Sequence, residues 1–155
     1  MHKIELDQFD IAILKALQKD SARTNAELSS IVNLSSSQCS RRRQRLEEAG
    51  AIAGYSARLN ASMLGFELRA ITRVNLNEHN EANATRFASF LLQQDEIRAA
   101  FSVSGDADYV LIIAATDLPA FADFIHSRLL PYPQVQHVRS EIVLTTLKDE
   151  NGVPL

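Results

Sequence analysis

The sequence predicts an α+β chain, with an N-terminal helix-turn-helix domain, with or without a wing, followed by a βαββαβ ferredoxin-like domain. Two segments, Thr24 to Glu27 and Ser35 to Gln38, place a hydroxyl three residues before a side chain that can complete a capping box. In the second half of the chain, alternating apolar segments are interleaved with segments of helical period. We therefore expect a helix-turn-helix domain over 1–54, a wing and hinge linker over 55–68, and the second domain over 69–155.

The first helix is expected to begin after Asp7, whose carboxylate can accept hydrogen bonds from the free amides of the first turn. Asp10 places a second acid in that turn, where the helix dipole favours negative charge. Leu6 and Ile11 stand on either side of the cap as a hydrophobic staple. Apolar residues continue from there at helical spacing, so one face of this helix is predicted to be buried.

Two shorter helices come next, and their spacing indicates the function of the domain. The segment after Thr24 has room for only two turns before Asn33 and Leu34 make a tight link to the next helix start at Ser35. In a helix-turn-helix the second helix enters a DNA groove. Here that helix carries arginine at 41, 42, 43 and 45, with no acid before Glu47. We interpret the domain as a reader of double-stranded DNA.

Individual contacts can be assigned along this helix. Residues near its N-terminus reach base edges, and glutamine can pair with adenine and arginine with guanine. We assign base readout to Ser36, Ser37, Gln38 and Arg41. Phosphate contacts are assigned to Arg42 and Arg45, and to Thr24 and Asn25 at the start of the preceding helix. A run of arginines is often only a solvated face, but this run comes directly after a helix-turn-helix.

The third helix is expected to end at Gly50, which can adopt the left-handed conformation of a C-terminal cap. Residues 51–59 then form two short extended pieces about Gly54. They are either a β-wing or only a linker strand, and the sequence leaves both open. The segment from Asn60 to Phe66 is the expected hinge into the second domain.

The second domain is predicted to contain four strands and two helices. The strands are expected at 70–76, 97–104, 109–115 and 135–147, and the helices at 83–94 and 117–130. This βαββαβ order gives a four-stranded antiparallel sheet with both helices on one face. Because the other face is left bare, we expect a homodimer.

Composition is compatible with these interpretations. The net charge of −3 is unusual for a DNA-binding protein, but the first 50 residues hold eight Lys and Arg against seven Asp and Glu. Local rather than net charge steers a phosphate backbone. Cys39 has no disulfide partner in the chain and is expected to pack in the core. With no apolar signal segment or membrane span, the protein is expected to be cytoplasmic.

The segment from Ser104 to Asp108 has two interpretations. As an ordinary hairpin turn it needs Gly105 for a positive φ and one Asp to cap the bend. It carries two carboxylates, however, which could receive a ligand ammonium while turn amides hold the ligand carboxylate. The four histidines are dispersed, and nothing resembles a metal site, a Ser-His-Asp set or a Gly-rich phosphate loop. No metal, cofactor or catalytic residue is therefore predicted.

Nearly the whole chain resembles the Lrp/AsnC (leucine-responsive and asparagine-responsive) family of transcription regulators. The matching positions are Leu6-Asp7, Asp10-Ile11, Ile13-Leu14, Leu17 to Asp20, Arg23, Asn25, Glu27 to Ser29, Leu34-Ser35, Cys39, Arg42, Leu46-Glu47, Gly50, Ile52, Gly54-Tyr55, Val103 to Asp106 and Asp108-Tyr109. The resemblance implies a DNA-binding dimer, often assembled into tetramers or octamers, that senses amino acids or their derivatives.

The resemblance also implies an effector site at a subunit interface, lined by Gly105, Asp106 and Asp108, with Ser102 and Ser104 as neighbours on the strand leading in. The chain departs from the family in its recognition helix. Family members often carry proline between Ser35 and Cys39, and often valine in place of Arg43. A guanidinium on that face must snorkel to solvent, pair with an acid or turn toward DNA.

These observations predict a sequence-specific transcriptional regulator whose affinity or oligomeric state is changed by an amino acid or related small molecule. A dimer with one head on each half-site predicts a pseudo-palindromic operator. One alternative is an architectural protein that bends DNA without an effector. Another is an enzyme, because some haem-pathway decarboxylases resemble this architecture, although the arginine-rich helix argues against it.

Overall fold

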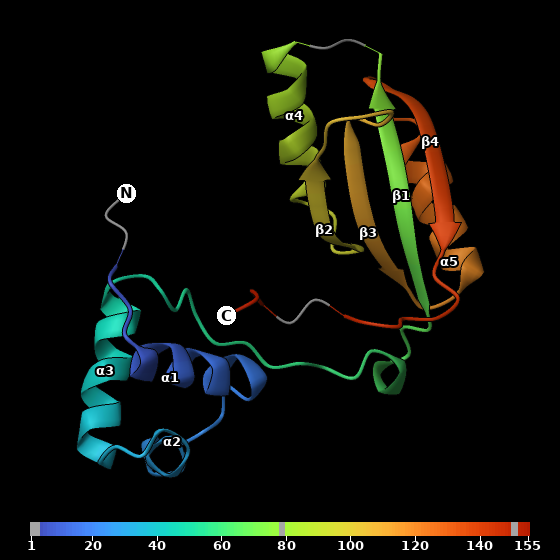
Figure 1. Cartoon of the computed structure of the whole chain (residues 1–155). Coiled ribbons are helices and arrows are strands. Elements are labelled where there is room, and N and C mark those ends of the chain that lie inside the picture. Colours follow the sequence, from blue (N-terminus) through green and yellow to red (C-terminus); the bar gives the residue numbers. More distant parts are fainter. Residues whose placement is uncertain (1–3, 78–79, 150–151) are drawn as a thin grey trace. The chain divides into compact units, whose positions relative to one another are not determined.

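The computed structural model describes residues 4–77, 80–149 and 152–155. The chain divides into two compact units (Figure 1). One comprises Met1–Arg58 together with Lys148–Leu155, and the other comprises Leu59–Leu147.

The first unit is a three-helix domain of α1 (Gln8–Lys19), α2 (Asn25–Val32) and α3 (Ser36–Glu48). Each helix begins with a complete capping box, formed by Asp7 with Asp10, Thr24 with Glu27 and Ser35 with Gln38. The predicted helix starts are confirmed, because each box satisfies amides that the first turn leaves free.

The three helices share one apolar core. Its buried members are Ile13, Ala16 and Leu17 of α1, Leu28 and Val32 of α2, and Cys39 and Leu46 of α3. Cys39 is fully buried, and this burial raises the pKa of its thiol. The thiol therefore packs as a small protonated side chain, as predicted.

Helix α3 ends in a glycine cap. Gly50 has φ +72°, its amide donates to Glu47 O at 3.0 Å, and the Ala51 amide donates to Leu46 O at 2.9 Å. This is a Schellman cap, and it confirms the predicted role of Gly50. The β-wing is not formed, since residues 53–60 have no strand structure. An extended segment becomes a strand only beside a hydrogen-bonding neighbour, and none pairs with it within the described part of the chain.

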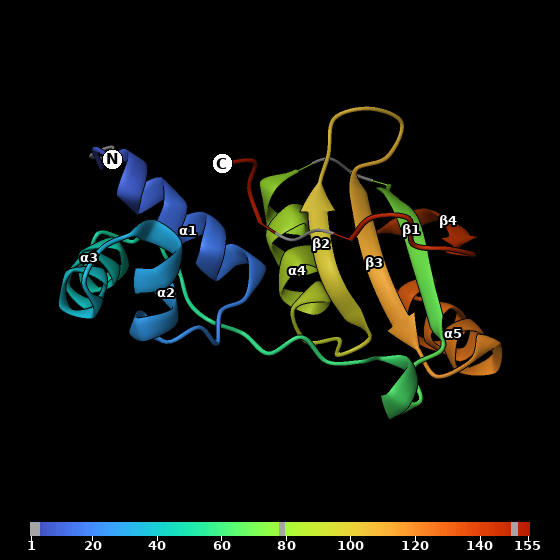
Figure 2. The same cartoon turned by 60° about the horizontal axis from the view of Figure 1, so that its bottom comes forward.

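The second unit is an antiparallel sheet with its helices on one face (Figure 2). Its elements are β1 (Leu68–Leu76), α4 (Glu81–Leu91), β2 (Ile97–Ser102), β3 (Tyr109–Ala115), α5 (Leu118–Phe124) and β4 (Val135–Ile142). The strand order is β2-β3-β1-β4, with every pairing antiparallel. This arrangement confirms the predicted βαββαβ fold.

The core of this unit lies between the sheet and the two helices. Every second residue of β1 and β3 is buried, and these residues pack against Phe87 and Leu91 of α4 and Phe121 and Phe124 of α5. Inside the sheet, the hydroxyls of Thr72 and Ser140 lie 3.0 Å apart and join β1 to β4.

Several predicted boundaries differ from the structure. Strand β2 ends at Ser102 instead of residue 104, and α4 covers Glu81–Leu91 instead of 83–94. The last strand ends at Ile142 instead of residue 147, because its neighbour β1 pairs Ala70 with Ile142 and begins at Leu68. Beyond that point Leu144 and Leu147 are more than nine-tenths exposed. The helix predicted over 117–130 changes after Phe124 into a π-helical turn, in which the Leu130 amide donates to Ile125 O at 2.9 Å.

Candidate nucleic-acid interface and ligand site

The N-terminal half of α3 gathers the four residues assigned to base readout. Ser36, Ser37, Gln38 and Arg41 are all exposed and lie within the first two turns. Arg41 forms no ion pair or hydrogen bond with any residue that the structure describes. Its guanidinium is thus available to an external partner.

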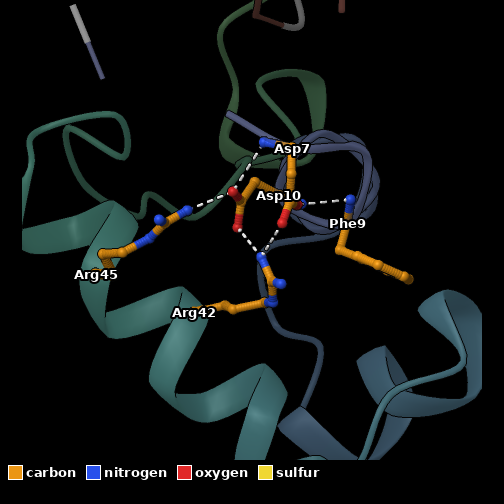
Figure 3. A network of polar contacts seen from close by, with 5 residues as sticks. All are labelled: Asp7, Phe9, Asp10, Arg42 and Arg45. Atoms are coloured by element: carbon orange, nitrogen blue, oxygen red, sulfur yellow. Dashed lines mark hydrogen bonds and ion pairs between the residues drawn. The ribbon is translucent and has the colours of Figure 1, made fainter. Parts of the chain in front are cut away.

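Arg42 and Arg45, assigned to phosphates, turn toward α1 (Figure 3). Arg42 Nη1 donates to Asp7 Oδ2 and to Asp10 Oδ1, each at 2.8 Å, and Arg45 Nη2 pairs with Asp10 Oδ2. The Arg42 guanidinium also lies 5.3 Å from the centroid of the Phe9 ring. Because the Arg45 side chain is still 51% exposed, it can approach a phosphate without leaving its helix face, whereas Arg42 is largely enclosed.

Asp10 has a structural role that was not predicted from the sequence. Its side chain is completely buried, and Oδ2 also accepts the Asp7 amide at 3.1 Å. A signal was present, because Asp10 stands three and seven residues before Ile13 and Leu17, on the apolar face. A carboxylate on that face needs a cationic partner.

The electrostatics of this cluster favour its charged forms. The hydrogen bond from the Asp10 amide and the neighbouring Arg42 lower the pKa of Asp7. Hydrogen bonds to Asp10 and Asp7 raise the pKa of Arg42. The ion pairs are therefore present at neutral pH, and they hold α3 against α1.

Arg43 pairs with an acid, which resolves the question that its unusual position raised. Its Nε donates to Glu47 Oε1 at 3.2 Å and to Tyr55 Oη at 2.8 Å, and its Nη1 donates to Arg23 O at 3.1 Å. Tyr55 Oη donates in turn to Glu47, and this bond lowers the pKa of the Glu47 carboxyl. Through Tyr55, these hydrogen bonds attach the beginning of the linker to α3. This is the segment in which either a β-wing or a linker strand was predicted.

The first turn of α2 carries a negative charge that the first turn of α3 lacks. Glu27 accepts the Thr24 amide at 2.7 Å and the Thr24 hydroxyl at 2.8 Å, and these bonds lower the pKa of its carboxyl. An ionised carboxylate thus stands beside Thr24 and Asn25, the two residues assigned to phosphate. This charge opposes a phosphate there, whereas the corresponding residue of α3 is the neutral Gln38.

In the second unit, the predicted ligand residues are divided between two hollows. The larger, of about 620 Å³, is lined by Arg73, Asn75, Val103, Ser104, Asp106, Ala107, Val110, His137, Val138 and Arg139. The smaller, of about 260 Å³, includes Ser102 and Asp108 among its lining residues. Gly105, at φ +132°, makes the turn between them.

Asp106 and Asp108 have different surroundings. Asp108 Oδ2 accepts the Leu76 amide at 2.8 Å, so this carboxylate anchors the end of β1. The Asp106 carbonyl accepts Asn75 Nδ2 at 2.7 Å, while the residue itself is exposed at the larger hollow. The basic side chains of this hollow, Arg73 and Arg139, were not predicted from the sequence, since they converge only through the register of β1 with β4.

The described residues contain no cluster of three or more potential metal ligands. Within the same residues, no helix is both long and apolar enough to cross a membrane.

Comparison with known proteins identifies both units. Residues 6–47 match the AsnC-type helix-turn-helix domain, and residues 69–153 match the Lrp/AsnC ligand binding domain. The chain is 40% identical to the leucine-responsive regulatory protein of Rhizobium meliloti (strain 1021), over 95% of this chain and 94% of the relative. It is 35% identical to that of Escherichia coli (strain K12), over 95% of this chain and 90% of the relative.

Solved structures agree with the sequence relatives. A transcriptional regulator from Neisseria meningitidis, solved as a complex with L-Met, matches with a TM-score of 0.92 and 36% identity over 97% of each chain. An AsnC family regulator from Agrobacterium tumefaciens matches with a TM-score of 0.90 and 28% identity, over 96% of this chain and 97% of the other. With both domains matched in the same order along the chain, this protein belongs to the Lrp/AsnC family of DNA-binding transcriptional regulators.

Proposed function

We propose that this regulator binds a pseudo-palindromic operator as a homodimer, with one α3 in the major groove of each half-site. Base edges are contacted by Ser36, Ser37, Gln38 and Arg41. Among the phosphate contacts, Arg45 is the main one because its side chain stays half exposed. Arg42, which is held by Asp7 and Asp10, and Thr24 and Asn25, which lie beside ionised Glu27, make weaker ones. The exposed and unpaired guanidinium of Arg41, within the described part of the chain, supports this orientation of the helix.

The effector in this proposal is an amino acid or a related small molecule, held in the larger hollow. The single observation that carries it is the placement of Arg73 directly opposite Arg139 on β1 and β4, beside Asp106. Like charges on facing residues repel, and Glu141 balances only part of this charge, through ion pairs to both arginines. A ligand carboxylate would balance the remainder, and a ligand ammonium would pair with Asp106.

Dimerisation and ligand binding are linked in this proposal because both use the face of the sheet that lacks helices. A ligand there would favour one assembly over another, such as a dimer, tetramer or octamer, and thereby change how many α3 helices engage DNA at once. The Neisseria relative, solved with L-Met, supports an amino acid as the class of effector.

The test is a fluorescence-anisotropy titration on DNA from upstream of the protein's own or adjacent gene, with a scrambled duplex as control. Titrations at two salt concentrations are run with and without individual amino acids, on the parent and on Asp106→Asn. We expect salt-sensitive preference for the upstream DNA, shifted by an amino acid in the parent only. Preference without any shift would favour an architectural protein, and no preference at all would contradict the proposal.

The two classes of arginine contact can be separated in the same assay. Arg41→Ala should relax preference at one operator position, because a base contact is lost. Arg45→Ala should weaken binding to all duplexes and reduce the salt slope by about one unit, because a phosphate contact is lost. Thermal melts control for the loss of the Arg45–Asp10 pair. If both variants bind like the parent, α3 is not the recognition helix.

A further inference from the structure

The capping box of α3 fixes the orientation of the side-chain amide of Gln38, so that its oxygen and its nitrogen point in known directions. Oε1 of the Gln38 side chain accepts hydrogen bonds from both the Ser35 backbone N–H and the Ser35 hydroxyl, each at 3.0 Å. The backbone N–H of Gln38 donates in turn to Ser35 Oγ at 3.2 Å. An amide oxygen has two lone pairs, and both are used here. The flipped orientation would set the side-chain NH₂ against the Ser35 N–H, donor against donor, so the network determines which atom points outward.

The outward atom of Gln38 is therefore a donor. Pairing with adenine in two hydrogen bonds requires the glutamine oxygen to accept from adenine N6 while its nitrogen donates to N7. With the oxygen engaged in the helix cap, that pairing would require the cap to open. Guanine presents two acceptors side by side in the major groove, N7 and O6, and no donor.

We propose that Gln38 is a specificity-determining residue that donates to guanine, instead of pairing with adenine. This inference rests on the proposed function, in which α3 faces the bases, and it specifies what that site reads. The same glutamine thus caps the helix with its oxygen and reads the operator with its nitrogen.

Ser37 complements Gln38 at the same turn. Ser35 has one hydroxyl proton, which it donates to Gln38, so the 3.1 Å contact between Ser35 Oγ and Ser37 Oγ uses the proton of Ser37. Ser37 then has only acceptor capacity outward. The two N–H donors of the Gln38 side chain, followed by the acceptor of Ser37, match the order acceptor, acceptor, donor (N7, O6 and cytosine N4) on the major-groove edge of a G·C pair, whereas an A·T pair presents acceptor, donor, acceptor.

The capping box of α2 provides an internal comparison. Its geometry is the same, but Glu27 replaces the amide, so its outward atom is an acceptor on an ionised carboxylate. Replacing Gln38 by Glu should therefore keep the α3 cap while converting the outward donor into an acceptor. Glu27→Gln makes the reciprocal change on α2 and is the matched control.

The experiment is selection of duplexes from a random-sequence library by the parent, Gln38→Glu and Glu27→Gln proteins, with affinity then measured on the selected and scrambled sequences. We expect the parent and Glu27→Gln to enrich guanine at one position of each half-site, and Gln38→Glu to enrich cytosine there. Gln38→Glu should also bind the parent sequence about tenfold more weakly, relative to scrambled DNA, as for one lost base contact. Equal helicity and melting temperature would verify the cap.

Each other outcome has a distinct meaning. Adenine at the position that Gln38→Glu alters would overturn the inference, because Gln38 would then read adenine, either through N7 alone or with an opened cap. An unchanged motif in Gln38→Glu would overturn it as well, since Gln38 would then touch no base. If the parent enriches no sequence, the proposed function itself fails, and the inference fails with it.

Discussion

Asp10 is the residue on which the helical unit depends most clearly. It is fully buried, yet it is an acid, and it lies among Asp7, Arg42 and Arg45 (Figure 3). A carboxylate buried without partners would be costly, but two guanidinium groups and one amide satisfy this one. Arg42 and Arg45 therefore stabilise the packing of α3 against α1, in addition to the phosphate contacts proposed for them.

Replacing Asp10 by Asn should lower the free energy of unfolding of the helical unit by about 1–3 kcal/mol, because two charge-assisted hydrogen bonds are lost. Urea denaturation monitored by helical circular dichroism measures this change. Asp20→Asn is the control, since Asp20 makes an exposed ion pair with Arg23 at 3.7 Å and accepts the Ala22 amide at 3.1 Å, a hydrogen bond that an asparagine oxygen can keep. It should cost less than about 0.5 kcal/mol. Equal losses in the two variants would contradict the structural role of Asp10.

Asp7 predicts how stability depends on pH. Its pKa is lowered from the ordinary value of 3.8, first by the Asp10 amide and also by Arg42. A carboxyl with a lowered folded pKa contributes stability that is complete above its unfolded pKa and is lost as the pH falls through its folded pKa. The helical unit should therefore lose stability below about pH 4, and Asp7→Asn should lose less.

Denaturation series between about pH 3 and pH 7 measure this dependence. Glu27 and Glu47 also have lowered pKa values in this unit and act in the same direction. The Asp7→Asn variant should consequently show a reduced acid effect with some dependence remaining. An identical pH slope in the parent and the variant would exclude Asp7 as a contributor.

Among the larger elements, the C-terminal segment makes an unexpected contact within the helical unit. Gln18 Nε2 of α1 donates to Val153 O at 2.9 Å, and the Val153 amide donates to Gln18 Oε1 at 3.0 Å. Gly152 precedes this pair at φ +91°, and a Cβ atom there would lie 2.4 Å from Gln18 Cδ. The positive φ favours glycine, and a Cβ atom would displace the end of the Gln18 side chain that makes these two hydrogen bonds.

Gly152→Ala should release this segment from α1. We expect the protection of the Val153 amide against hydrogen exchange to fall about tenfold, as for the loss of one to two hydrogen bonds. Gly54→Ala is the matched control, because Gly54 has open space around it and no positive φ. Unchanged exchange at Val153 in Gly152→Ala would show that the contact does not persist in solution.

At the scale of the whole molecule, one face of the sheet has no helix packed against it. Helices α4 and α5 lie on the opposite face (Figure 2), and the residues that alternate with the core on β1 and β3 are only partly buried. Ile71 and Ile112 lie directly opposite one another on this face. Apolar residues at the centre of an open sheet favour association with a second copy.

Ile112→Glu should convert the proposed dimer into a monomer, because a carboxylate would be buried without a partner at the interface. Sedimentation equilibrium measures the mass, and circular dichroism checks that the fold is retained. Leu118→Glu introduces the same charge at a residue of α5 that is 60% exposed and should leave the mass unchanged. A parent protein that sediments as a monomer would contradict the proposed assembly.

Structural features that depend on residues close together in the chain were determined by the sequence itself. The three capping boxes, the glycine at the end of α3 and the alternation of β1 and β3 each involve residues a few positions apart, so their geometry depends on local chemistry. The order of those elements predicted the βαββαβ sheet, and the motifs along both halves predicted the Lrp/AsnC family, which the comparisons confirm. The contacts assigned to DNA and to the effector stay predictions.

Other features depended on contacts between residues far apart in the chain, which only the tertiary structure decided. Arg42 and Arg45 meet Asp10 across 32 and 35 positions, and Arg73 faces Arg139 only through the register of β1 with β4. The end of β4 was likewise set by where β1 begins, although its sequence continues to alternate. The tendency of a residue to form a helix or a strand depends on its neighbours in sequence, whereas the partner of its side chain depends on tertiary packing. For this reason the contacts of Arg42 and Arg45 could not be assigned from the sequence of α3 alone.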